Sequence, residues 1–88
     1  MITWTPDLER PDGKKRHSAE IANYRLVVFE GPTDFTWFAY VLRSRFDREH
    51  TAFAQNHAPT LAEAQNAARN ATIDDIMGTT RTLVTELL

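Results

Sequence analysis

Residues 24–45 decide the fold, and they read YRLVVFEGPTDFTWFAYVLRSR. Two runs that are dense in aromatic and β-branched residues flank the turn formers GPTD at residues 31–34. Aromatic and β-branched side chains fit the pleated surface of a strand, and a Gly-Pro-Asp cluster reverses the chain between strands. The stretch therefore predicts a β-hairpin, with one strand over residues 19–30 and the next over residues 35–45.

Both strands of this hairpin carry apolar residues on both faces. In the second strand the apolar residues are consecutive, and they are Trp37, Phe38, Ala39, Tyr40, Val41 and Leu42. Successive side chains of a strand point to opposite faces of the sheet, so neither face is polar enough to be left in water. A single helix can cover one face only. We expect the other face to be covered by a terminal segment or by a partner.

Toward the N-terminus, residues 1–5 (MITWT) place Ile2 and Trp4 on one face and predict a short edge strand that Pro6 ends. Residues 6–18 then combine two prolines, an Asp-Gly pair and a run of charges. This composition is typical of a solvated loop. We predict a mobile charged loop there.

Toward the C-terminus, residues 48–58 alternate weakly and are polar, which predicts an edge strand. Thr60-Leu61-Ala62-Glu63 has the pattern of a capping box, in which the Thr hydroxyl accepts a hydrogen bond from the Glu amide. A helix therefore begins here. The fold class predicted is α+β: an antiparallel three- to four-stranded β-meander packed by one capped C-terminal helix, in a single domain over residues 1–88.

The predicted helix has a stripe of small residues, which are Leu61, Ala64, Ala68 and Ala71. Small side chains allow the helix axis to approach the sheet closely. Ile73, Ile76 and Met77 fall off this stripe, and TIDD at residues 72–75 looks like a second cap, so we expect the helix to bend or restart near residue 72 before it ends at Gly78. The apolar tail at residues 79–88 fits either a strand or a short amphipathic helix.

Composition limits the class of protein. The 88 residues suffice for one domain, and the 42% apolar and 25% charged content is that of a globular chain. The absence of cysteine excludes disulfides, thiolate metal sites and a Cys nucleophile. No apolar run approaches the roughly 20 residues that span a bilayer, and the first residues do not resemble a signal peptide. We expect a cytoplasmic protein without membrane association.

Residues with catalytic potential are few and scattered. Three glycines leave no phosphate-binding loop, and the three histidines, His17, His50 and His57, show no metal-ligand spacing. Asp34 and Asp47 stand at predicted strand ends, where Asp is above all a turn residue. We therefore predict a chain that is not an enzyme, with no cofactor and no metal.

Surplus aromatic and apolar residues favour binding instead. The sequence predicts a small non-catalytic regulatory module that docks on a partner protein through a sheet face or an edge strand, like an antitoxin or an inhibitor from a phage or mobile element, with a homodimer as a further form. The candidate contact residues are Trp4, Trp37, Phe38, Tyr40, Leu83 and Leu87. The alternative is a nucleic-acid-binding module that uses the basic loop at residues 10–16 and the sheet, through Lys14, Lys15, Arg16, Arg43, Arg45 and Arg48. A net charge of −2 gives no overall positive field for that role.

The chain has two predicted strands, an edge strand and then a helix that opens with TLAEAQNAA at residues 60–68. In this order of elements it resembles two families. One is the plant ethylene-response type of DNA-binding domain, with the related arm-binding domains of integrases, whose three-stranded sheet lies on DNA. The other is the HicB-type antitoxin. The resemblance covers residues 35–71. It departs from the first family in its polar, Arg-poor edge strand, and from the second in lacking a Pro- and Gly-rich segment before the helix.

Overall fold

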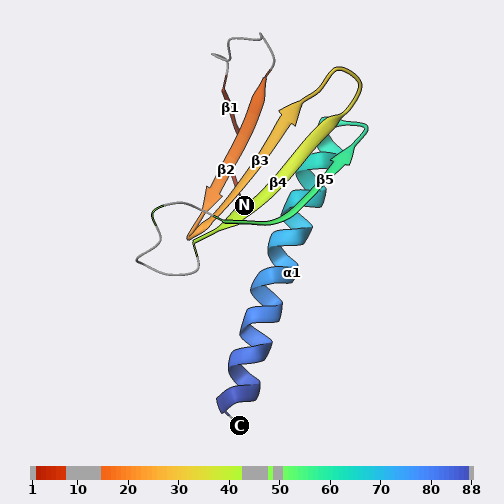
Figure 1. Ribbon diagram of the computed structural model, residues 1–88. Helices are drawn as coiled ribbons and strands as arrows, with labels where there is room; N and C mark the ends of the chain where they lie inside the picture. Colours follow the sequence, from red (N-terminus) through yellow and green to blue (C-terminus); the bar gives the residue numbers. More distant parts are fainter. Residues whose placement is uncertain (1, 8–14, 43–47, 49–50, 88) are drawn as a thin grey trace.

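A computed structural model describes residues 2–7, 15–42, 48 and 51–87, and it contains an antiparallel sheet with one long helix on one face (Figure 1). The sheet has five strands in meander order: β1 (Thr5–Asp7), β2 (Arg16–Ile21), β3 (Tyr24–Glu30), β4 (Phe35–Val41) and β5 (Thr51–Ala58). The helix α1 spans Leu61–Leu87. The predicted α+β meander with one C-terminal helix is confirmed, with one strand more than the highest number expected.

The additional strand comes from a tight turn that divides residues 19–30. This segment was predicted as one strand, which is wrong, because β2 and β3 are separate antiparallel partners joined at Ala22 and Asn23. Ala22 has a φ of 52°, a left-handed conformation that alanine seldom adopts. The Asn23 side-chain amide donates to the Leu42 carbonyl at 2.7 Å, and the Leu42 amide donates to the Asn23 carbonyl at 2.9 Å. Contacts distant in sequence therefore fix this turn.

The central hairpin follows the prediction. β3 and β4 are paired in the register Leu26↔Ala39, and the turn at residues 31–34 is closed by the Gly31 amide, which donates to the Asp34 carbonyl at 2.8 Å. This register places Tyr24, Leu26 and Val28 on the same face as their cross-strand partners Val41, Ala39 and Trp37.

The two edges of the sheet are β1 and β5. β5 was predicted as an edge strand over residues 48–58, and the structure confirms an edge strand with a later start. The first strand occupies residues 5–7 instead of residues 1–5, and it includes Pro6. Proline has no N–H to donate to a neighbouring strand, and an edge strand tolerates this because one of its sides has no neighbour. Residues 16–18 of the predicted loop belong to β2. Residues 8–14 of that loop lie outside the described residues.

The helix begins as predicted and then continues without a break. The Glu63 amide donates to the Thr60 hydroxyl at 3.2 Å, which confirms Thr60 as the N-cap. The predicted restart at residue 72 is wrong, because α1 is continuous from Leu61 to Leu87: Thr72 is 4% exposed, and its hydroxyl donates to the Ala68 carbonyl at 2.9 Å within the helix. The tail at residues 79–87 is the last part of the same helix and projects beyond the sheet (Figure 1).

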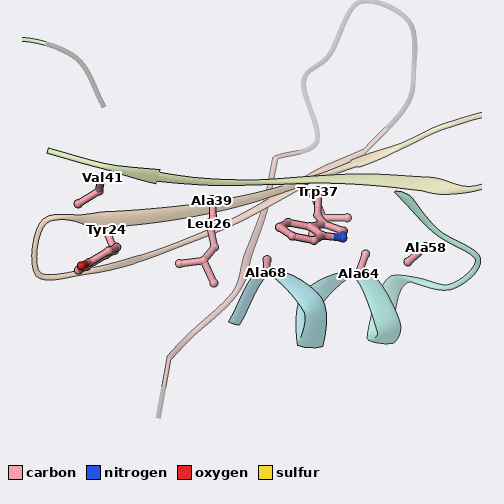
Figure 2. Packing of buried hydrophobic residues seen from close by; sticks show 9 residues of the cluster. Tyr24, Leu26, Trp37, Ala39, Val41, Ala58, Ala64 and Ala68 are labelled. Atoms are coloured by element: carbon pink, nitrogen blue, oxygen red, sulfur yellow. The ribbon is translucent and has the colours of Figure 1, made fainter. Parts of the chain in front are cut away.

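The core lies between α1 and the β3–β5 face of the sheet. Leu26, Trp37 and Ala39 point from the strands toward Ala64 and Ala68 of the helix (Figure 2). Both helix alanines are fully buried. The large side chains of the core therefore come from the strands, and the small side chains of the helix let its axis lie close to the sheet. At the far end of this contact, the Tyr24 hydroxyl donates to the Asp75 carboxylate at 2.8 Å.

Removal of the N-cap should weaken the fold by a small, measurable amount. In a Thr60→Ala variant the Glu63 amide loses its acceptor, and we expect the free energy of unfolding to fall by about 1 kcal/mol. Urea denaturation followed by circular dichroism measures this change. A Thr60→Ser variant keeps the hydroxyl and should stay close to the original chain. Equal losses in both variants would mean that the cap is not what stabilises the helix start.

Candidate functional site

The sheet face that points away from α1 carries a row of aromatic side chains. We call it the aromatic face, and it consists of Val27, Phe29, Phe38 and Tyr40. The Phe29 and Phe38 rings meet edge to face with centroids 5.6 Å apart, and Phe38 stacks on Tyr40 at 5.8 Å. The three rings are half-buried, whereas Val27 is 4% exposed between its cross-strand neighbours Ser18 and Phe38. Among the described residues, no helix or strand lies across this face.

Charged residues border the aromatic face on the side of β2. The register sets Arg25 opposite Tyr40 and Arg16 opposite Phe29. Glu20, opposite Arg25 on β2, places its carboxylate 3.8 Å from the Arg25 Nε. The aromatic face therefore combines stacked rings with a charged rim, where Glu20 partly balances the positive charge of Arg25.

A second apolar surface runs along the helix. We call it the helix stripe, and it consists of Ile73, Ile76, Met77, Val84 and Leu87. Their exposed fractions are 44%, 41%, 56%, 51% and 87%, which is high for side chains of this size and type. Five large exposed apolar residues on one element form a surface of the kind that marks interaction sites.

The helix stripe and the buried face of α1 lie on opposite sides of the same helix. A residue advances about 100° around an α-helix, so Met77 lies about 180° from Ala68, and Ile73 lies about 180° from Ala64. The first half of α1 thus turns its small residues toward the sheet. In the second half Ile73 and Met77 lie on the opposite side, while Ile76 lies only about 80° around the helix from Ala68. This change of face explains why Ile73, Ile76 and Met77 fall off the alanine stripe within one continuous helix.

Between the helix and the N-terminal segment is a half-open groove of about 360 Å³. Ile2, Trp4 and Ile21 form one wall, and the opposite wall includes Arg69 and Ile73 of α1. The groove is mainly apolar, and Ile73 and Ile76 belong both to it and to the helix stripe. The two features are therefore one continuous surface.

The contacts of His57 do not have the geometry of a catalytic relay. His57 Nδ1 lies 3.0 Å from the Thr36 hydroxyl and 3.5 Å from the Asp34 carboxylate. Both partners meet the same ring nitrogen, whereas a relay of the nucleophile–base–acid type needs one partner on each nitrogen. The His57 and Asp34 side chains are also 59% and 42% exposed, so water reaches this contact. Within the described residues, no group of three or more His, Asp or Glu side chains is arranged to hold a metal ion.

The structure separates the predicted partner-contact residues. Phe38 and Tyr40 lie on the aromatic face, while Trp37 is 8% exposed in the core on the opposite face. Trp4 packs against the core and lines the groove. Leu87 ends the helix stripe, and the side chain of Leu83 lies outside the described ones.

The predicted basic residues are described only in part. Lys15 and Arg48 are exposed, and Arg16 is half-buried in β2. Lys14, Arg43 and Arg45 lie outside the described residues, as do His50 and Asp47. The described residues therefore bring only Arg16 of the predicted cations to the aromatic face, where Arg25 joins it.

Sequence reasoning missed several surface residues. Phe29 was left out of the candidate contact residues, although it shares a strand face with Val27, two residues before it. Ile73, Ile76 and Met77 were noted as lying off the alanine stripe, but the assumed break at residue 72 hid their spacing with Val84 and Leu87. A continuous helical period over residues 61–87 would have revealed the stripe.

Comparison with known proteins found no matching family model, no matching curated protein and no matching solved structure. In the part of the chain that the structure covers, α1 lacks the combination of length and apolar character that a membrane crossing requires. The function is therefore argued from the residues themselves.

Proposed function

We propose that this chain is a non-catalytic binding module that docks on a partner protein through the aromatic face, in the manner of an inhibitor or antitoxin acting in the cytoplasm. The observation that carries the proposal is the contact between Phe29, Phe38 and Tyr40 on the sheet face opposite the helix. Aromatic residues that are held rigidly on a sheet supply large contact area at a small cost in conformational entropy.

The charges of the aromatic face favour a protein over a nucleic acid as partner. Arg25 shares its neighbourhood with Glu20, and the whole chain has a net charge of −2. Nucleic-acid affinity comes mainly from uncompensated Lys and Arg beside phosphates. Protein interfaces instead combine an aromatic centre with a polar rim of mixed charge, which is what these residues provide.

Site-specific photocrosslinking in the native host tests this proposal. A photoreactive amino acid at Phe38 or Tyr40 should form a defined adduct with one protein, and the same group at the exposed Glu63 should not. With the captured partner in hand, Tyr40→Ala should weaken binding by at least about tenfold, the effect of losing an interface anchor.

The control variant for this measurement is Ile76→Ser, which changes an exposed side chain on the helix stripe and leaves the sheet unchanged. It should bind the partner like the original chain. Circular dichroism of each variant shows whether the fold is kept. Unchanged partner affinity in a folded Tyr40→Ala variant would rule out the aromatic face as the docking surface.

Nucleic-acid binding is the second candidate, and one observation favours it. The Arg25 side chain is 38% exposed next to Tyr40, although its Nε is paired with Glu20, so the exposed part of its guanidinium lies within reach of a phosphate or a base edge next to a stacking ring. This function would show as a mobility shift at low salt that weakens steeply as salt rises and is lost in Arg25→Glu. Absence of any shift at low salt would remove it.

A further inference from the structure

We infer that α1 pairs with the α1 of a second copy of this chain, with the two helices antiparallel along the helix stripe. This inference is independent of the proposed function, because the stripe and the aromatic face belong to different elements. A dimer of this kind would carry two copies of the aromatic face.

The spacing of the stripe is that of a helix-pairing seam. Four residues of the helix stripe, Ile73, Met77, Val84 and Leu87, are joined by Thr80 in a row with alternating intervals of four and three residues, and we call these five residues the seam. This is a repeat of 3.5 residues, which keeps a seam facing a second helix. All five residues are exposed. The seam covers about 22 Å of helix, from a rise of 1.5 Å per residue.

The charges beside the seam select an antiparallel second copy as the occupant. Asp74 and Arg81 are seven residues apart, so both flank the seam on the same side, and both are exposed. A two-fold axis between residues 78 and 79 places Asp74 two residues, about 3 Å along the helix, from the level of Arg81 of the second copy. Both side chains are long enough to meet across this offset, and the symmetric pair forms at the same time. The same axis sets Ile73 opposite Val84. In a parallel, in-register pair, Asp74 of one copy and Arg81 of the other would lie about 10 Å apart along the helix and on opposite sides of the seam, so this contact would not form.

This register also provides cover for the most exposed residue of the stripe. Leu87 of the second copy reaches the level of Asn70, beside Arg69 and the mouth of the groove that Ile2 and Trp4 line. Leu87 is 87% exposed in the single chain. The named contact residues are the five of the seam with Asp74 and Arg81, fewer than the roughly 20 to 30 per side of a standard interface, so we expect a dissociation constant in the micromolar range.

Sedimentation velocity of the full chain over a concentration series provides the first test. The average mass should rise from the 10.1 kDa of one chain toward twice that value. Met77→Glu places a charge in the seam and should weaken dimerisation by at least about tenfold. The matched control is Ala62→Glu, an exposed position of the same helix outside the seam. A chain that stays monomeric at every concentration, or a dimer that Met77→Glu leaves intact, would overturn the inference.

A charge exchange tests the antiparallel register. Asp74→Arg and Arg81→Asp should each weaken self-association, because each variant faces itself with like charges. A mixture of the two variants restores opposite charges at both positions, and at low salt it should associate about tenfold more tightly than either variant alone. If the mixture associates no better than its components, the register is wrong. The aromatic face is unchanged in all these variants, so the outcome does not depend on the partner-binding proposal.

Discussion

Leu26→Ala should lower the free energy of unfolding by about 2 to 5 kcal/mol, a large loss for a single truncation. Leu26 is fully buried on β3 and points toward the helix (Figure 2). Its removal loses the transfer free energy of three carbon atoms, and a cavity remains because the surrounding strands are held by their ladders. A small domain has only about 5 to 15 kcal/mol of stability, so much of it would be lost.

Denaturation by urea with two probes measures this loss, and the slope of the transition should stay the same while its midpoint falls. The matched control is Ile73→Ala, which truncates a residue that is 44% exposed and should cost well under half as much. Comparable losses at the two positions would contradict the assignment of the core to the β3–β5 face.

Ala68→Leu should also destabilise the fold, by about 1 to 3 kcal/mol, although it adds apolar surface. Ala68 is fully buried where the helix approaches the sheet, with Leu26 and Trp37 in the same cluster. A larger side chain there must displace the helix or force a strand residue from its rotamer. The free energy of unfolding, measured as above, should therefore decrease.

Ala62→Leu is the control for this overpacking, because Ala62 is exposed in the same helix and leucine has nearly the helix propensity of alanine. This variant should remain within a few tenths of a kcal/mol of the original chain. A stable Ala68→Leu variant would mean that the helix and the sheet are not in close contact at this position.

Local signals predicted much of the fold. The turn at residues 31–34 contains residue types that reverse a chain, and Thr60 with Glu63 identifies a helix start, so both were predicted correctly. The turn at Ala22 and Asn23 was missed because alanine carries no turn signal and the left-handed φ is held by contacts with Leu42. The helix was predicted to break at Thr72 because its hydroxyl resembles a cap, whereas burial turns that hydroxyl to the Ala68 carbonyl.

The candidate surfaces were predictable to a smaller extent. The expectation that one helix would leave half of the apolar sheet uncovered led to Phe38 and Tyr40, which lie on the aromatic face. The face occupied by Trp37 depends on which side of the sheet the helix covers, and alternation alone does not reveal this side. The helix stripe required knowledge that α1 is continuous, because its period becomes visible only across the assumed break.

The helical order of the part of α1 that projects beyond the sheet depends on what this part contacts. The part that projects beyond the sheet contains Gly78 and a high share of threonine, residues with low helix propensity, and an addition at the Gly78 Cβ position would meet nothing within 4 Å. Isolated helices this short are marginal in water, so tertiary contacts are their main source of stability. The end of the helix should therefore fray when the second copy dissociates and become ordered when it binds. Slow amide exchange over residues 79–87 would then report that the surface is covered, just as an increase in average mass does.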